Sequence, residues 1–443
     1  MVTSRMLRAE SPRILALFRA SVALVFLISH EPADLAARAA RSPAVLRAPE
    51  GLGYLVHTFP WSPLATDLLR ITYYASAAFL LVGLFTRASA LALCLSGYLV
   101  FATCQLSGAV LHDMHVLWFA ALLAACPCPS ALSLDAFFES TDARWWRRPL
   151  GPTEPHAQAG LTLFFARTLL GLVYLFPGLH KLHTSGLAWA LSDNLQNQMF
   201  IKWFEHGVLP PFRIDHYPRL LQALGLGTLL FELSNVFLVH VGRRTRIALA
   251  LAGLAFHLSI QVFLFIPFSS LWLCYTALAS TRATKPVGLA DLTPGRPLLV
   301  LGTLFVALVF AQGLRGRMQS FPFACYPTFE WRAGNTLPDL RVVAIDADGR
   351  EREVPVGRNA QGRRSQENWG QAFSLAGVYG TPFSAARVQE YLRQERKQLH
   401  VARALEGARR IRIERADYAV APEQRGAPPT RTVTLAELPL ETP

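Results

Sequence analysis

Titratable side chains gather in and beside the long apolar runs of this sequence, where a lysine or histidine could transfer protons. The set is His112, Asp113, His115, His180, Lys181, His183 and His257. Lys181 stands out because the chain has only four lysines among its 43 basic residues, so a need for charge alone would have been met by arginine. A buried lysine, unlike an arginine, can lose its proton and act as a base. Several titratable groups at one depth are typical of a proton-handling or ligand-binding site.

Polar residues also repeat at helical spacing within three apolar runs. The run 160–181 carries Arg167, Gly171, Tyr174, Gly178 and Lys181, and the run 217–241 carries Gln222, Gly225, Thr228, Glu232 and Asn235. The run 245–265 carries Gly253, His257 and Gln261. Residues three or four apart share one helix face, and such polar faces avoid lipid. We therefore expect the three faces to converge. The predicted cavity residues are His112, Asp113, Tyr174, Gly178, His180 and Gln261.

Arg167 and Glu232 are expected to form an ion pair with an architectural role. Both fall roughly 10–14 Å from the same predicted end of their helices, at about 1.5 Å per residue. A lone buried charge costs several kcal/mol, so opposite charges at one depth should pair.

A metal site is an alternative reading of the histidines. His112 and His115 are three residues apart, as are His180 and His183. Four imidazoles at one level could hold zinc, copper or iron. The six cysteines form no spaced metal motif and no disulfide framework, and we predict no metal cofactor.

The composition is that of a polytopic membrane protein. Of the 443 residues, 52% are hydrophobic and 16% are charged, whereas soluble domains carry about 25% charged residues. The net charge of +13 suits an anionic membrane surface, and no nucleic-acid-binding motif accompanies it. The expected partner is the lipid bilayer, and nucleic acid is excluded.

Nine apolar runs are long enough to be considered as transmembrane helices. They lie near 13–30, 64–85, 88–107, 111–127, 160–181, 217–241, 245–265, 267–281 and 297–314, with the fourth and eighth short enough to be tilted or re-entrant. The mixed stretches 43–61 and 186–209 read as interfacial. The predicted fold is an all-α membrane helix bundle with a small C-terminal α+β domain outside the membrane.

Basic clusters recur between alternate runs and set the expected orientation. They include Arg87, the arginines at 144–148 and those at 243–246. The positive-inside rule makes these loops cytoplasmic, which puts the N-terminus inside and the C-terminal domain outside. We expect an integral protein of a bacterial inner (cell) membrane.

The polar region after the last run divides into a domain and a tail. We assign residues 10–318 to the membrane domain, 319–420 to the α+β domain and 421–443 to a flexible tail. Residues 341–345 and 350–354 flank Asp348 and Gly349, a pattern that predicts a β-hairpin. Residues 384–409 are expected to be helical.

Three short stretches carry a resemblance to a known family: Leu172–Leu182 (LVYLFPGLHKL), His115–Leu123 (HVLWFAALL) and Phe256–Gln261 (FHLSIQ). They resemble the vitamin K-dependent γ-carboxylase-like family, also described as the horizontally transferred transmembrane (HTTM) domain. In addition, Phe321–Phe329 is similar to a sequence that follows the last span in bacterial members. The resemblance covers about residues 10–330. The Gly-x-x-Lys-Leu piece at Gly178–Leu182 is its most specific part.

The resemblance implies a chemistry for these positions. Lys181 matches the base that deprotonates reduced vitamin K, and His115 and His257 match family histidines, so all three are candidate catalytic residues. The implied cofactor is reduced vitamin K or another quinol, and the implied substrate is a polypeptide glutamate that is carboxylated. His180 departs from the family, which has lysine there, and Asp113 stands where asparagine is expected.

In addition to the metal-site hypothesis, the sequence therefore leaves two functional hypotheses from different classes. The first is a carboxylase-like enzyme, a carbon–carbon bond-forming lyase coupled to quinol oxygenation, with the quinol in an outer-leaflet cavity. The second is a non-enzymatic membrane binding or accessory protein that retains the fold.

Overall fold

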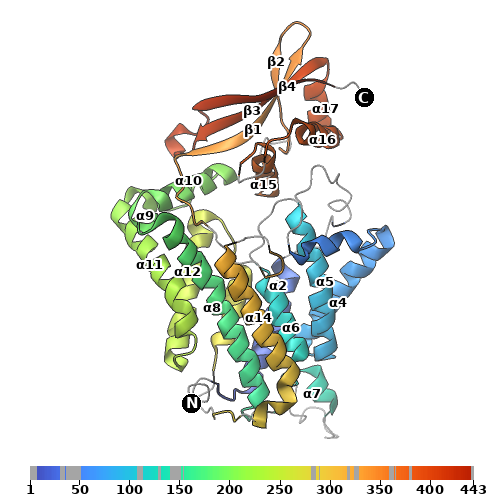
Figure 1. Ribbon diagram of the computed structural model, residues 1–443, viewed down its shortest axis with the longest axis vertical. Helices are drawn as coiled ribbons and strands as arrows, with labels where there is room; N and C mark the ends of the chain where they lie inside the picture. The colour runs from blue at the N-terminus through green and yellow to red at the C-terminus, as the bar shows by residue number, and fades with distance from the viewer. Residues whose placement is uncertain are drawn as a thin grey trace.

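Long helices make up most of the chain and stand side by side beneath a small C-terminal domain (Figure 1). The computed structural model describes residues 7–29, 35, 51–106, 113–127, 131–139, 151–152, 154–280, 286–288, 290–316, 320–323, 329–358, 364, 366–378 and 382–440. The longer bundle helices are α2 (Pro12–Ser29), α4 (Pro63–Val82), α5 (Thr86–Leu106), α6 (His115–Ala125), α8 (Ala157–Ser185), α11 (Pro218–Leu238), α12 (Arg243–Leu264) and α14 (Arg296–Arg315). Shorter elements are η1 (Leu52–Thr58), α7 (Leu134–Glu139), α9 (Ala188–Leu191), α10 (Asn194–His206), η3 (Ile214–His216), α13 (Ser269–Cys274), η4 (Tyr275–Leu278) and η5 (Ala290–Gly295).

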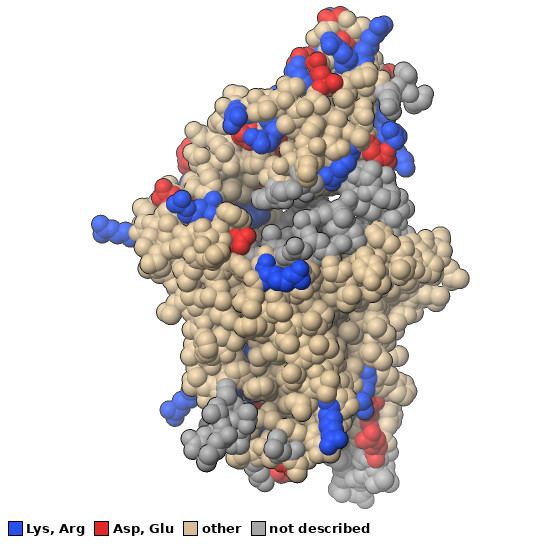
Figure 2. Space-filling view, in the orientation of Figure 1, with Lys and Arg blue, Asp and Glu red and all other residues tan. Residues whose placement is uncertain are grey.

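The outer surface of the bundle is apolar. Leu230, Leu251 and Leu314 expose 70%, 62% and 66% of their surfaces. Figure 2 shows a broad band almost without charged residues between the N-terminal end and the C-terminal domain. An apolar surface of this extent is suited to lipid rather than water. The chain is a helical membrane protein, as its composition predicts.

Five helices among the described residues are long and apolar enough to cross a membrane. They are α5, α8, α11, α12 and the helix formed by η5 with α14. The prediction of nine transmembrane helices is not confirmed. The fourth predicted span contains the 11-residue helix α6, and the eighth is broken into α13 and η4. Helices of 11 and 6 residues extend only about 17 and 9 Å, well short of a hydrocarbon core of about 30 Å.

Glycines allow α14 and α11 to pack closely against α8. A Cβ atom on Gly302 or Gly313 of α14 would overlap Phe165 or Phe176 of α8. The order of these contacts shows that α14 runs parallel to α8. On another face, Gly171 of α8 lies against α11, where an added Cβ would be 2.6 Å from Val236 Cα. Glycine is therefore required where the two backbones approach most closely.

Substituting Gly171 with alanine is expected to destabilise the protein by about 1–3 kcal/mol, because the Cβ atom meets the backbone of α11 and one helix must move. Gly227→Ala on α11 is the matched control, because its Cβ atom would meet nothing within 4 Å. The control should be neutral or slightly stabilising. Thermal unfolding in detergent checks this, and equal effects of the two substitutions would contradict the packing argument.

The C-terminal domain is a four-stranded antiparallel sheet with helices packed against it. Its elements are β1 (Thr336–Asp346), β2 (Glu351–Val354), α15 (Gln366–Leu375), α16 (Ala385–Glu395), α17 (Leu399–Leu405), β3 (Ala408–Ala419), the 3-10 helix η6 (Pro422–Gln424) and β4 (Arg431–Pro439), in sheet order β2-β1-β3-β4. The predicted β1–β2 hairpin is confirmed, with Gly349 at a positive φ of 82° in its turn. The predicted helix over 384–409 corresponds to α16 and α17.

The prediction of a flexible tail over 421–443 is wrong. Strand β4 pairs with β3, with Thr434 opposite Glu414. Thr432, Val433, Thr434 and Leu435 supply the β-branched and apolar side chains that favour a strand. The α+β domain therefore extends at least to Pro439 instead of ending at residue 420.

Helix α10 connects this domain to the bundle. Phe200, Ile201 and Phe204 of α10 pack against Trp369 and Phe373 of the domain. Arg425, after η6, donates to the backbone oxygen of Trp203 at 2.9 Å. The stretch 186–209 is predicted to be interfacial. In the structure it contains α10, which lies between the helix bundle and the C-terminal domain (Figure 1).

Candidate functional site

Lys181 and Glu232 form a buried ion pair between α8 and α11. The distance from Lys181 Nζ to Glu232 Oε1 is 2.5 Å, and the two residues are only 3% and 5% exposed. Gly178, one turn before Lys181, lets Glu232 approach, because an added Cβ would lie 3.0 Å from Glu232 Cβ. The predicted pair of Arg167 with Glu232 is therefore wrong: Glu232 pairs with the residue that the sequence singles out for chemistry.

The two helices are offset along their axes, which explains the error. His240, just beyond the end of α11, lies 3.1 Å from the hydroxyl of Thr168, measured from its Nε2. Thr168 is 11 residues into α8, so α11 ends about 16 Å above the start of α8. Depths counted from the two helix ends are thus not equal. Arg167 lies beside the end of α11, and Glu232 lies opposite Gly178.

Arg167 instead belongs to a polar cluster at the N-terminal end of the bundle. Its Nη2 lies 3.1 Å from Glu10 Oε1, and its Nε donates to the backbone oxygen of Ala277 at 2.8 Å. Ser280 also donates to Glu10, and Arg246 Nη2 lies 3.7 Å from it. Glu10 is only 1% exposed. This cluster ties α8, α12 and the broken segment after α12 to the start of the chain.

The Lys181–Glu232 pair lines a small cavity among α8, α11 and α12. The lining residues are Val173, Tyr174, Pro177, Lys181, Trp189, Leu195, Gln198, Thr228, Glu232, Phe256, His257, Ile260, Leu264, Phe268, Leu271 and Phe329. Most are apolar, and the free volume is about 100 Å³. Pockets for whole drug-sized ligands hold about 300–1,000 Å³, so this cavity suits a small aromatic headgroup rather than a whole ligand.

A chain of hydrogen bonds adjoins the pair. Tyr174 Oη lies 2.7 Å from His257 Nε2 and 2.5 Å from Tyr275 Oη. Gly253 leaves room for Tyr275, because an added Cβ would lie 2.2 Å from its hydroxyl oxygen. Neighbouring hydroxyl and imidazole groups can pass protons along such a chain. The predicted convergence of the three polar faces is therefore confirmed at Tyr174, Lys181, Glu232 and His257.

The other predicted residues that the structure describes do not line this cavity. His115 is buried at the start of α6 with its ring against Phe119, and Asp113 lies just before that helix. His180 Nε2 is 2.8 Å from Gly313 O, and its Nδ1 is 4.0 Å from a carboxylate oxygen of Glu330. Burial raises the pKa of Glu330, and His180 and His183 oppose the rise. Gln261 is half-buried on α12, and His112 lies outside the described residues.

The alternative metal site gains no support. Among the residues that the structure describes, no group of three or more His, Cys, Asp or Glu side chains could hold a metal ion. His112, one of its four proposed ligands, is outside that part of the chain.

Sequence reasoning missed Trp189, Gln198 and Tyr275. The Trp189 ring centroid lies 5.0 Å from Lys181 Nζ, a cation–π distance. Trp189 follows Gly186, where the chain turns back over the end of α8 with φ of 59°. The sequence signal for this position is a glycine followed three residues later by a tryptophan, directly after a long predicted span. That pattern could have predicted that the Trp189 ring lies over the end of α8.

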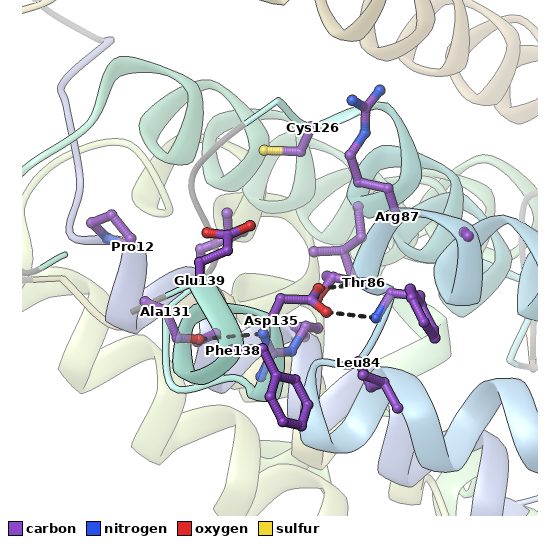
Figure 3. Close-up of a pocket in the computed structure, with 15 residues that line it drawn as sticks. Pro12, Leu84, Thr86, Arg87, Cys126, Ala131, Asp135, Phe138 and Glu139 are labelled. Carbon is purple, nitrogen blue, oxygen red and sulfur yellow. Dashed lines mark hydrogen bonds between the residues drawn. The ribbon is translucent and has the colours of Figure 1, made fainter. Parts of the chain in front are cut away.

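A second and larger cavity lies at the opposite end of the bundle (Figure 3). It measures about 700 Å³, and two of its charged residues, Asp135 and Arg19, have structural roles. Asp135 accepts hydrogen bonds from the backbone nitrogens of Phe85 and Thr86 at 2.7 and 2.9 Å, which caps the start of α5. Arg19 donates to the backbone oxygens of Ala131 and Leu132. We place the functional site at Lys181, because that cavity holds a buried ion pair between two helices.

Comparison with known proteins identifies no family and no function for this chain. The chain matches no family model, no curated protein and no solved structure.

Proposed function

We propose that this membrane protein binds a quinol-type ring in the cavity among α8, α11 and α12 and removes the proton of a ring hydroxyl. The observation that carries the proposal is the Lys181–Glu232 pair, buried in an otherwise apolar cavity. Ionisable groups inside membrane domains are expensive and mark functional sites by default. An apolar pocket with a few convergent polar groups is the usual form of a small-molecule site.

The lining of the cavity favours an aromatic ring as its ligand over an ion or a sugar. Trp189, Phe256, Phe268 and Phe329 offer aromatic contact, and the free volume of about 100 Å³ accommodates a headgroup. A lipid-borne ring could leave its tail among the apolar helices. Tyr174 and His257 provide a route for the released proton.

The resemblance to the γ-carboxylase-like family extends the proposal to a reaction. In that reaction the deprotonated quinol is oxidised by dioxygen, and the oxygenated product is basic enough to take a proton from carbon before carbon dioxide adds. We propose Lys181 and His257 as residues of this half-reaction. We also propose that the site faces the outer leaflet of a bacterial cell membrane, on the side of the C-terminal domain.

The test is binding and aerobic oxidation of a naphthoquinol by the purified, detergent-solubilised protein. Wild type is compared with Lys181→Ala and with Lys202→Ala, a control lysine on α10 that pairs with Glu205 at 2.6 Å. Turnover that needs Lys181 but not Lys202 supports the proposal. Binding without turnover favours the non-enzymatic binding protein, and a folded protein that neither binds nor oxidises the quinol refutes the proposal.

A further inference from the structure

The second oxygen of the Glu232 carboxylate is a buried acceptor without a partner. Glu232 Oε2 has no hydrogen bond to any residue that the structure describes, although Oε1 accepts from Lys181 at 2.5 Å. Glu232 is 5% exposed and lines the cavity. An unsatisfied buried acceptor costs about 1–3 kcal/mol, more when charged, so a ligand that donates a hydrogen bond here is favoured. A ring hydroxyl is such a donor.

The surroundings of Lys181 are those of a charged ammonium group. Its Nζ donates to Glu232 Oε1 and faces the Trp189 ring at 5.0 Å from the centroid. A carboxylate and an indole face both stabilise a cation. An ammonium group has no lone pair, so in this state Lys181 cannot accept a proton.

Three other polar groups of the cavity wall form hydrogen bonds with neighbouring residues. Gln198 donates to the backbone oxygen of Trp331 at 3.3 Å, and the Thr228 hydroxyl donates to Leu224 O at 2.9 Å. Tyr174 is held by His257 and Tyr275. Glu232 is the one carboxylate among the cavity-lining residues that the structure describes, and a carboxylate takes up a proton more readily than a hydroxyl or amide oxygen does.

We propose that Glu232, rather than Lys181, is the base of this site, and that Lys181 stays an ammonium group that stabilises the resulting oxyanion. This inference rests on the proposed function and assigns its proton acceptor. The O–H bond of the ring hydroxyl breaks, its proton goes to Glu232 Oε2, and the electron pair remains on the ring oxygen.

Charge balance favours this assignment. Before transfer the cavity holds one ammonium and one carboxylate, and after transfer it holds one ammonium, one carboxylic acid and one ring oxyanion. The net charge is zero in both states, so the negative charge only moves from Glu232 to the ligand beside Lys181. No additional charge must be desolvated, which keeps the transfer inexpensive in an apolar cavity.

The test measures ionisation of a bound hydroxy-aromatic probe, 2-naphthol, whose absorption band shifts when its hydroxyl loses the proton. Purified wild type, Glu232→Gln and Lys181→Arg are titrated with 2-naphthol at neutral pH, and 2-methoxynaphthalene reports binding without a transferable proton. Thermal unfolding shows that each variant is folded. Arginine cannot serve as a base, so Lys181→Arg separates the cationic role from the basic one.

We expect the bound probe to be ionised in wild type and in Lys181→Arg but neutral in Glu232→Gln, with the ionised fraction falling by roughly tenfold or more because no carboxylate then accepts the proton. Ionised probe in folded Glu232→Gln would overturn the assignment and return the role to Lys181. If Lys181→Arg does not fold, the result for Glu232→Gln alone decides whether Glu232 or Lys181 is the base. Failure of wild type to bind either naphthalene would instead refute the proposed function.

Discussion

Replacing Lys181 with methionine is expected to lower the free energy of unfolding by about 3–5 kcal/mol, because it leaves the Glu232 carboxylate buried without a counter-ion. Methionine has a similar length, so the loss of charge outweighs the change in packing. The two residues are 3% and 5% exposed, so water cannot replace the missing partner. Quinol oxidation should disappear in the same variant.

A double-mutant cycle separates the pair from the general effect of substitution. Glu232→Leu alone should be similarly destabilising, because it leaves the ammonium group unpaired. The double variant Lys181→Met/Glu232→Leu should recover most of the stability, since a well-packed apolar pair can replace a buried ion pair at little cost. Thermal and denaturant unfolding in detergent measure the cycle. Additive losses in the double variant would show that the ion pair does not hold the two helices together.

Helical spacing alone predicts much of the candidate site. The four- and three-residue steps from Arg167 to Lys181 lie within the observed helix α8, and the faces of α8, α11 and α12 meet at Tyr174, Lys181, Glu232 and His257. Periodicity is sufficient for these three helices because ionisable residues are costly in lipid and their polar faces turn toward the protein interior. The side of each helix is therefore predictable from sequence.

The position of each helix along the bundle axis is less predictable from sequence. That position determines which charged residues lie at the same depth and can pair. Sequence patterns place helix ends only to within a few residues, and each residue shifts a side chain by about 1.5 Å along the axis. The bundle helices also begin at different heights, as the contact between His240 and Thr168 shows. Glu10 precedes the first apolar run, so the sequence gives no depth at which to pair it with Arg167.

Short polar strands are also hard to recognise from sequence. The stretch 431–439 follows a Pro-rich segment and looks like a loose tail, yet it pairs with β3 as strand β4. The β-branched residues there favour a strand, but strand formation also depends on pairing with the preceding strand β3, which the composition of 431–439 alone does not reveal. The hairpin of β1 and β2 was predictable because its turn residues are local.

Replacing Glu10 with glutamine is expected to destabilise the protein by about 3–5 kcal/mol, as much as breaking the Lys181–Glu232 pair. Glu10 is 1% exposed and accepts from Arg167, with Arg246 3.7 Å away. Without its charge, two arginines face each other with no carboxylate between them. The backbone oxygens of Ala277 and Ala279 still accept from Arg167 but only partly offset a full charge.

The exposed pair of Asp67 and Arg70 provides the matched control for this substitution. Their side chains are 3.7 Å apart and 66% and 48% exposed, so Asp67→Asn should change stability by less than about 1 kcal/mol. Arg167 and Lys181 are 14 residues apart on α8, about 21 Å, so Glu10→Gln and Lys181→Met should be additive to within about 0.5 kcal/mol. Glu10→Gln should also retain probe binding while folded, because its cluster does not line the cavity. Equal effects of Glu10→Gln and Asp67→Asn on Tm would show that the cluster is not a structural anchor.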